Sequence, residues 1–182
     1  IRWGAYFSPR GIDAEQMRLF RASGLTHIEF GTESFCDRTL EAYGKHFTFG
    51  DVVRASRLAL DEGVYYAHFL ILGGYGDTRE NVRETIENSR RMEYTVMFPY
   101  AGMRIYPHTR LAAKEGAIGR DDDLMAPSYY ISRDFDLEEV RRAALATGKA
   151  WVFPDDPQSA LADTLRLKRN KKGPLWEYLR KP

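Results

Sequence analysis

The strongest constraint on the fold is a repeated alternation of strand-like and helix-like segments. Segments typical of strands are Ile1–Phe7, His27–Phe30, Tyr65–Leu72 and Tyr94–Phe98, each separated from the next by enough chain for a helical crossover. Tyr65–Leu72 is a nearly continuous apolar run, which is typical of a strand covered on both faces in a parallel sheet. The alternation predicts an α/β fold of parallel strands and crossover helices, either a parallel α/β sheet or part of a (β/α) barrel.

The connecting segments carry the signals of amphipathic helices. A helix is expected to begin at Asp13, with Gln16 completing a capping box, and to end at Gly24. A short helix is expected over Asp37–Ala42 and a longer one from about Phe49 to Glu62. The helix after the third strand is expected to take Asp77 as its N-cap, with Glu80 as the capping-box partner.

The alternation ends after residue 107, so we divide the chain into a barrel region, residues 1–107, and a mainly helical C-terminal extension, residues 108–182. The expected helices of the extension are Thr109–Glu115, a segment from Asp136 to about Thr147, Ala160–Leu167 and Leu175–Leu179. In the helix capped by Asp136, the spacing of Leu137, Val140 and Ala144 predicts a buried face.

Composition excludes several classes of protein. The 182 residues carry a net charge of +1, which gives no reason to expect nucleic-acid binding. No apolar run approaches the roughly 18 residues that indicate a membrane span, and no signal peptide opens the chain. We therefore expect a cytoplasmic protein without a membrane partner. The chain begins directly in a strand without an initiator Met, which suggests a piece of a longer domain.

Candidate functional residues follow the predicted strands, because ligand sites of parallel α/β sheets lie at the carboxyl ends of the strands. Glu33, just after Gly31, could bind an ammonium group or a ribose hydroxyl, or could be an ordinary charge in the first turn of a helix. The loop Gly73–Gly76 could bring backbone N–H groups close to a ligand, or could be an ordinary tight turn. No phosphate-loop motif follows it, so a nucleoside triphosphate is not expected.

No metal site is expected from the residues present. The four histidines show no metal-ligand spacing, and we interpret them as structural or partly exposed. Cys36 is the only cysteine, and an iron–sulfur cluster needs three or four thiolates. The basic stretch Arg166–Lys172 could contact phosphate but is more typical of a solvated helix end. No catalytic residue is assigned.

Two segments match strands of one enzyme family. Ile28–Ser34 has the pattern i-x-i-G-x-E-S of the fourth barrel strand in that family, followed by Leu40 and Lys45 at the family's spacing. Phe69–Thr78 matches the fifth strand and its turn, usually f-i-x-G-x-P-G-E-T. In that turn Tyr75 replaces the proline and Asp77 replaces the glutamate.

Two later segments add to the resemblance. Met103–Thr109 is similar to the segment after the sixth strand, with His108 in place of a glycine, and Leu124–Ser132 is similar to a stretch in members with cobalamin. In order and spacing, residues 1–132 resemble the radical S-adenosylmethionine (SAM) enzymes, in the subgroup with an upstream cobalamin-binding domain.

The resemblance implies a partial (β/α) TIM-like barrel, with about four parallel strands and crossover helices, in which Ile1–Phe7 is the third barrel strand. The first two strands, with the Cys-x-x-x-Cys-x-x-Cys loop that binds the 4Fe–4S cluster, would lie in the upstream half of the same polypeptide. The parent enzyme would cleave SAM reductively to a 5′-deoxyadenosyl radical that attacks a small-molecule substrate. Cobalamin would bind outside these residues, and methyl transfer, rearrangement or ring formation could follow. The chain alone would be inactive.

The resemblance also assigns roles to single residues. Glu33 would contact the sugar or the amino-acid part of SAM, Lys45 its carboxylate, and Gly73 and Gly74 the adenine or ribose. Ser8 would face the barrel interior beside the cofactor. Tyr100 and Arg104 would face the interior toward the substrate.

Two alternatives stay open. One is an α/β domain without a cluster that binds a small ligand, and the other is a tRNA-modifying radical SAM enzyme, although the predicted helical tail argues against the latter. A barrel that begins at its third strand would leave Ile1–Phe7 with an unpaired edge, so we expect self-association through that strand or an added segment that covers it.

Overall fold

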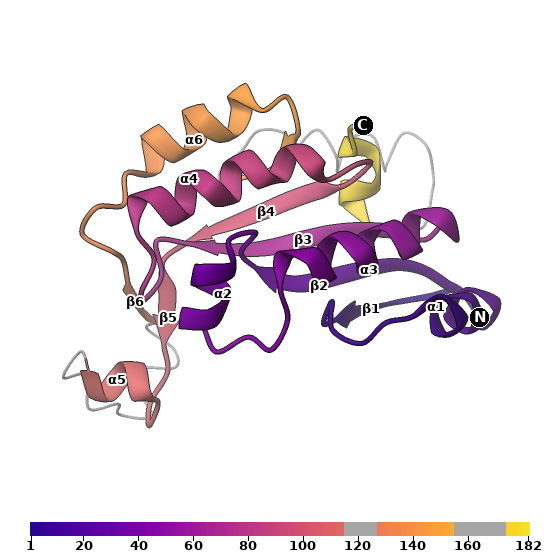
Figure 1. Cartoon of the computed structure of the whole chain (residues 1–182), viewed down its shortest axis with the longest axis horizontal. Coiled ribbons are helices and arrows are strands. Elements are labelled where there is room, and N and C mark those ends of the chain that lie inside the picture. Colours follow the sequence, from indigo (N-terminus) through magenta and orange to yellow (C-terminus); the bar gives the residue numbers. More distant parts are fainter. Residues whose placement is uncertain (115–126, 155–173) are drawn as a thin grey trace.

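The computed structural model describes residues 1–114, 127–154 and 174–182. Its centre is a parallel five-stranded sheet in the order β1-β2-β3-β4-β7. Figure 1 labels β1 to β4 of this sheet. The strands are β1 (Trp3–Phe7), β2 (Leu25–Glu33), β3 (Tyr65–Leu72), β4 (Val96–Ala101) and β7 (Ala150–Trp151). The predicted α/β fold of parallel strands with crossover helices is confirmed.

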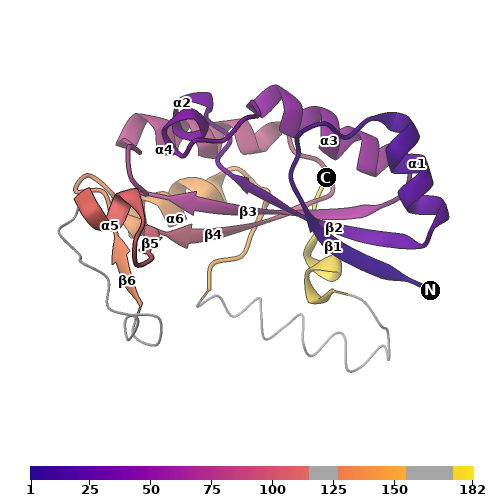
Figure 2. The same cartoon turned by 90° about the horizontal axis from the view of Figure 1, so that it is seen from below.

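Helices cover one face of this sheet, as Figure 2 shows for α1, α3 and α4. The helices on this side are α1 (Ala14–Ala22), α2 (Asp37–Ala42), α3 (Phe49–Asp61) and α4 (Arg79–Asn88), and α6 (Leu137–Ala146) packs against α4. The 3-10 helix η1 (Ser89–Arg91) continues α4, and a second 3-10 helix, η3 (Leu175–Leu179), lies on the opposite face (Figure 2).

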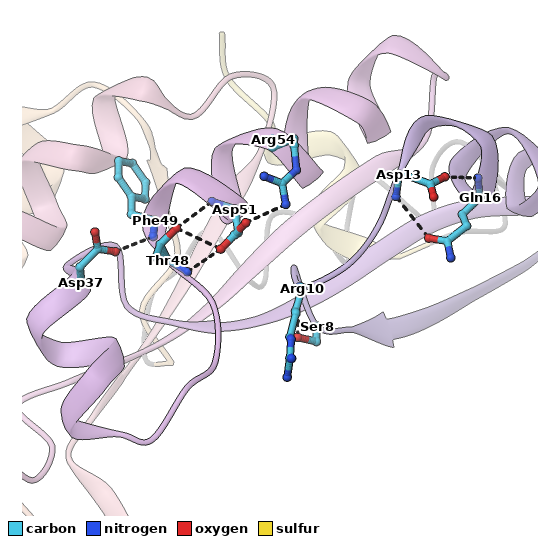
Figure 3. Close-up of polar contacts among 9 residues, drawn as sticks. All are labelled: Ser8, Arg10, Asp13, Gln16, Asp37, Thr48, Phe49, Asp51 and Arg54. Atoms are coloured by element: carbon cyan, nitrogen blue, oxygen red, sulfur yellow. Dashed lines mark hydrogen bonds and ion pairs between the residues drawn. The ribbon is translucent and has the colours of Figure 1, made fainter.

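Local capping explains where two of these helices begin (Figure 3). Asp13 accepts a hydrogen bond from the Gln16 N–H at 2.8 Å, and the Gln16 side chain accepts one from the Asp13 N–H at 3.2 Å. At the start of α3, Thr48 and Asp51 form the same reciprocal pair. Because each box satisfies N–H groups that have no partner inside the helix, it marks the first turn. The capping box predicted at Asp13 is confirmed.

Asp77 is not the N-cap of α4, contrary to the prediction. Thr78 is the N-cap, and its hydroxyl accepts a hydrogen bond from the Asn81 N–H at 3.2 Å. The buried Asp77 side chain instead accepts the Gly73 N–H at 2.9 Å and the Thr39 hydroxyl at 2.8 Å. Because buried donors are costly to leave without an acceptor, the carboxylate turns toward these two groups rather than toward the helix.

Two further differences from the sequence-based expectations have local causes. The fourth strand begins at Val96 rather than Tyr94, because Tyr94 has a left-handed backbone (φ +48°) that no regular strand contains. In α6 the N-cap Asp136 and the buried Val140 and Ala144 agree with the prediction, but Leu137 is 38% exposed. Leu137 is the first residue of the helix, about one turn before the buried Val140.

The C-terminal region adds to the sheet as well as to the helical layer. Ala150 and Trp151 pair in parallel with Val96 and Met97, so a short strand follows α6 within the segment that was expected to be mainly helical. Next to the end of β4, β5 (Met103–Ile105) pairs antiparallel with β6 (Ser128–Tyr130), and α5 (Arg110–Lys114) follows β5. The predicted helix Ala160–Leu167 and the basic stretch Arg166–Lys172 lie outside the described residues.

The main core lies between the helices and the sheet. It has two regions, one around β3, α4 and α6 and the other around β2, α1 and α3, with fully buried members such as Leu70, Trp151, Met17 and Ile28. A smaller cluster on the opposite face joins Ala67, Val96 and Trp176. In the described residues, no helix is long and apolar enough to cross a membrane.

Candidate functional site

Two adjoining cavities lie at the carboxyl ends of β1, β2 and β3. The first has a volume of about 360 Å³ and is lined by Ser8, Gly31 and residues of the 44–47 loop. The second, of about 400 Å³, is lined by Tyr43, Ile71 and Arg104 among others. Glu33 and Lys45 line both cavities, so these two side chains form the boundary between them.

Glu33 and Lys45 form an ion pair with 3.0 Å between the Lys45 Nζ and the Glu33 Oε1. The side chains are only 22% and 31% exposed, respectively. A partly buried charge is less screened by solvent than one at the surface, so this pair presents a strong acceptor and a strong donor to anything in the cavities. The strand-end position predicted Glu33 and the family resemblance predicted Lys45, and the structure brings the two side chains together.

The backbone at Glu33 has an uncommon conformation. Its φ of +66° lies in the left-handed region, which a residue with a Cβ adopts only at a cost of about 1 kcal/mol or more. The ladder between β2 and β3 is also irregular here, since Gly31 lies opposite Phe69 but Glu33 lies opposite Leu70. A bulge of this kind re-aims a side chain at the end of a strand.

Lys45 reaches the site because α2 is attached to the turn after β3. The Thr39 hydroxyl donates to Asp77, and the Tyr43 hydroxyl accepts the Gly74 N–H at 3.1 Å. Burial raises the pKa of both Asp77 and Tyr43. These contacts hold the end of α2, two residues before Lys45, against the neighbouring strand.

Gly73 and Gly74 are surrounded by protein atoms. A Cβ on Gly73 would lie 2.5 Å from the Phe135 ring, and one on Gly74 would collide with the Tyr43 hydroxyl. Gly74 lines neither of the two cavities, and Gly73 lines a different one between α4 and α6. Close packing of side chains therefore accounts for both glycines, and their contact with adenine or ribose stays a prediction.

The other predicted site residues divide between two places. Ser8 lines the first cavity, where its hydroxyl accepts the Arg10 N–H at 3.3 Å (Figure 3). Arg104 lines the second cavity, with its guanidinium 4.8 Å from the centre of the Tyr106 ring. Tyr100 lines neither; it borders a separate cavity of about 120 Å³ and is 49% exposed.

Sequence reasoning missed a polar cluster directly beneath the site. His68 is completely buried on β3, with its Nδ1 2.7 Å from the Thr32 hydroxyl and its Nε2 3.3 Å from the Ser56 hydroxyl. Burial lowers the pKa of His68 to about 3, so the ring is neutral at physiological pH. Thr32 and His68 are 36 residues apart, and no local pattern indicates that they meet.

A second missed feature lies on the sheet face opposite the helices. Glu29 accepts a hydrogen bond from the Trp176 indole N–H at 3.1 Å. A hydrogen bond with the same carboxylate raises the pKa of Tyr6 to about 12. Tyr6 also contacts Phe69 edge to face, with ring centres 5.7 Å apart.

No group of His, Cys, Asp and Glu side chains in the described part of the chain is placed to bind a metal ion. Cys36 is a buried free thiol at the start of α2. A cluster that needs several thiolates therefore has no ligand set among the described residues.

Comparison with known protein families gives a match over the first half of the chain. The model of the radical SAM superfamily matches residues 2–88, which contain Ser8, Glu33, Lys45, Gly73 and Gly74.

Two curated relatives are similar over part of the chain. An uncharacterized methyltransferase of Pyrococcus horikoshii is 26% identical over 113 residues, 59% of this chain and 25% of that protein. The anaerobic magnesium-protoporphyrin IX monomethyl ester cyclase of Rubrivivax gelatinosus is 32% identical over 78 residues, 43% of this chain and 14% of that protein. The chain thus spans a quarter or less of the length of these relatives.

Solved structures of radical SAM enzymes are similar as well. The methyltransferase TsrM from Kitasatospora setae, with tryptophan substrate and a SAM analog bound, has a TM-score of 0.58 and 25% identity, covering 63% of this chain and 22% of that one. Coproporphyrinogen III oxidase from Escherichia coli has a TM-score of 0.55 at 16% identity, covering 90% of this chain and 38% of that one. The latter likeness concerns the fold alone.

Proposed function

We propose that this chain, whose residues 2–88 match the model of the radical SAM superfamily, is the later half of a radical SAM enzyme barrel and supplies the Glu33–Lys45 portion of its SAM site. The upstream half of the same polypeptide would provide the thiolates for the 4Fe–4S cluster, since Cys36 is the only cysteine here. The proposal rests on one observation: the ion pair between two cavities at the carboxyl end of β2.

The chemistry of the pair fits the amino-acid part of SAM. That part carries an ammonium group and a carboxylate at neutral pH. The Glu33 carboxylate can accept from the ammonium, and the Lys45 ammonium can donate to the carboxylate, so each partner gains a ligand of opposite charge. The partly buried position strengthens both contacts relative to the surface.

The remaining residues would shape the site around the cofactor. Ser8 borders the cavity on the β1 side, and Arg104 borders the one on the β5 side, where a small-molecule substrate could approach. When bound and reductively cleaved, SAM supplies radical chemistry, and the protein orients the reactants and excludes water. Cobalamin as a second cofactor is supported by a TsrM structure that holds both cobalamin and a 4Fe–4S cluster.

The test uses the full polypeptide that contains this chain, purified without oxygen and reconstituted with iron and sulfide. About four iron and four sulfide per chain are expected for a single 4Fe–4S cluster. Absence of iron after reconstitution would favour the alternative, an α/β domain that binds a small ligand without a cluster.

SAM affinity then tests the residues. We expect Glu33→Gln and Lys45→Met each to weaken SAM binding by about 10- to 100-fold, because a charge-assisted hydrogen bond contributes about 1.5–3 kcal/mol. Glu84→Gln is the matched control, since Glu84 forms an exposed ion pair with Arg38 away from both cavities. Unchanged affinity in Glu33→Gln, measured by equilibrium dialysis, would place SAM elsewhere.

A further inference from the structure

The buried cluster of Thr32, His68 and Ser56 bears directly on the backbone conformation of Glu33. Thr32 is the residue that the β2–β3 ladder skips, because Gly31 pairs with Phe69 and Glu33 with Leu70. As the extra residue of a bulge, Thr32 has no partner of its own on β3. Its side chain is completely buried, and its hydroxyl is bonded to the ring of His68.

The bulge decides where the Glu33 side chain points. Residues opposite one another in a parallel ladder point to the same face of the sheet. Leu70, opposite Glu33, is completely buried in the helix-side core. Glu33 does not follow it; with a φ of +66° its carboxylate lines the two cavities and contacts Lys45.

We propose that His68 is a positioning residue that holds Thr32 in this bulge and thereby orients the Glu33 carboxylate toward the site. The proposal rests on the SAM-binding role of Glu33 given above. A left-handed conformation at a residue with a Cβ persists only where the surroundings enforce it. His68 is well suited to enforce it, because it is also bonded to Ser56 on α3 and stacks on Phe30, with ring centres 5.6 Å apart.

A second hydrogen bond makes Thr32 central to the turn. The Ser34 N–H donates to the Thr32 carbonyl at 2.8 Å, across Glu33. Thr32 is therefore held on its side chain by His68 and on its backbone by Ser34, and Glu33 lies between these anchors. If the hydrogen bond between the Thr32 hydroxyl and His68 is lost, the bulge can relax, and the Glu33 backbone can leave the left-handed region.

The first test is Thr32→Val in the reconstituted full polypeptide, with SAM affinity as the readout. Valine has nearly the same shape and the same branched Cβ but no hydroxyl, so the strand preference is kept. We expect SAM binding to weaken about three- to tenfold, within the range of couplings between contacting residues. Thr32→Ser, which keeps the hydroxyl, should restore the parent affinity.

The control separates positioning from general destabilisation. Thr95 is also a buried threonine, and its hydroxyl donates to the Tyr66 carbonyl at 3.0 Å, away from both cavities. Thr95→Val should lower the melting temperature about as much as Thr32→Val and leave SAM affinity unchanged. Equal loss of SAM affinity in both variants would show that destabilisation alone is responsible and would overturn the proposal.

A pair of His68 variants covers the case in which Thr32→Val does not fold. The Asn amide can occupy the place of Nδ1, which contacts Thr32, whereas the Gln amide can reach the place of Nε2, which contacts Ser56. We expect His68→Asn to keep SAM affinity and His68→Gln to lose it. The reverse order would contradict the proposal.

A double-mutant cycle with Glu33→Gln distinguishes the two proposals. If Thr32 acts through Glu33, then Thr32→Val should weaken SAM binding no further in the Glu33→Gln background. A full additional loss there would mean that Thr32 acts by another route. If Glu33→Gln alone leaves affinity unchanged, the proposed function fails; if only Thr32→Val is silent, the positioning role of His68 fails and the proposed function stands.

Discussion

At the residue scale, Gly73 shows how a position that looks like a ligand contact can be required by packing. Its φ is +73°, and an added Cβ would lie 2.5 Å from two ring carbons of Phe135. Phe135 comes from the segment before α6, 62 positions later in the sequence. A glycine-rich turn in the sequence is compatible with a ligand or with a neighbouring side chain. Here the Phe135 ring packs against the turn.

We expect Gly73→Ala to lower the free energy of unfolding by about 2–4 kcal/mol, the combined cost of a left-handed alanine and of overpacking against the ring. Gly148→Ala is a matched control, because Gly148 has a φ of +75° and no atom within 4 Å of an added Cβ. The free energy of unfolding of Gly148→Ala should fall by only about 1 kcal/mol. Urea denaturation measures the free energy of unfolding of both variants. Equal decreases in the two variants would mean that the Phe135 ring moves aside without cost.

At the element scale, the start of α4 shows the limit of local capping rules. Asp77 and Thr78 are both common N-cap residues, and the sequence favoured Asp77 because Glu80 lies three positions later. The buried Gly73 N–H and Thr39 hydroxyl settle the choice, since a carboxylate near these donors satisfies both. The caps Asp13 and Asp136, whose carboxylates accept N–H groups of their own helices, were predicted correctly.

The edge strand β1 is expected to be a contact between copies of the chain. In the described part of the chain β1 pairs only with β2, and Tyr6 within β1 is 71% exposed. We propose that the 182-residue chain self-associates through Ile1–Phe7, because unpaired backbone groups at a sheet edge invite pairing. Sedimentation velocity should show a species larger than the monomer as concentration rises.

Tyr6→Lys tests whether β1 is the contact. The new ammonium can still pair with Glu29, so the fold should persist, while a charge at the edge opposes strand pairing. We expect the variant to remain monomeric at concentrations where the parent associates. A parent chain that stays monomeric throughout would contradict self-association.

At the scale of the whole molecule, the C-terminal segment joins distant parts of the fold. Trp176 is 5% exposed and donates to Glu29, which lies 147 positions earlier. The Arg180 guanidinium lies 3.8 Å from the centre of the Tyr65 ring, and Lys181 forms an antiparallel bridge with Thr95. These contacts cover the sheet face opposite the helices, near the amino ends of the strands.

We expect Trp176→Ala to lower the free energy of unfolding by about 3–5 kcal/mol, as for other large buried aromatic side chains. Trp176→Phe keeps most of the apolar area and loses the bond to Glu29, so it should lose about 1–2 kcal/mol. The difference between the two decreases, measured by urea denaturation, separates the contribution of apolar burial from that of the hydrogen bond to Glu29. A negligible loss in Trp176→Ala would show that the segment does not contribute to the sheet.

Much of the fold was determined by the sequence alone, because its signals are local. Alternation of strand-like and helix-like segments predicted the parallel sheet, and Tyr65–Leu72 was placed with correct bounds. The short strand Ala150–Trp151 was missed, because two residues carry no periodicity and only the neighbouring β4 gives them a partner.

For the site, the sequence predicted the carboxyl ends of the strands and, with them, Glu33, whereas Lys45 was predicted only from the family resemblance. Only the tertiary structure decided that the Glu33 and Lys45 side chains meet, that Tyr100 lies apart, and that His68 contacts Thr32, the residue before Glu33. The physical reason is that hydropathy and capping depend on neighbours in sequence, whereas the direction of a side chain at a bulge depends on buried groups from other strands.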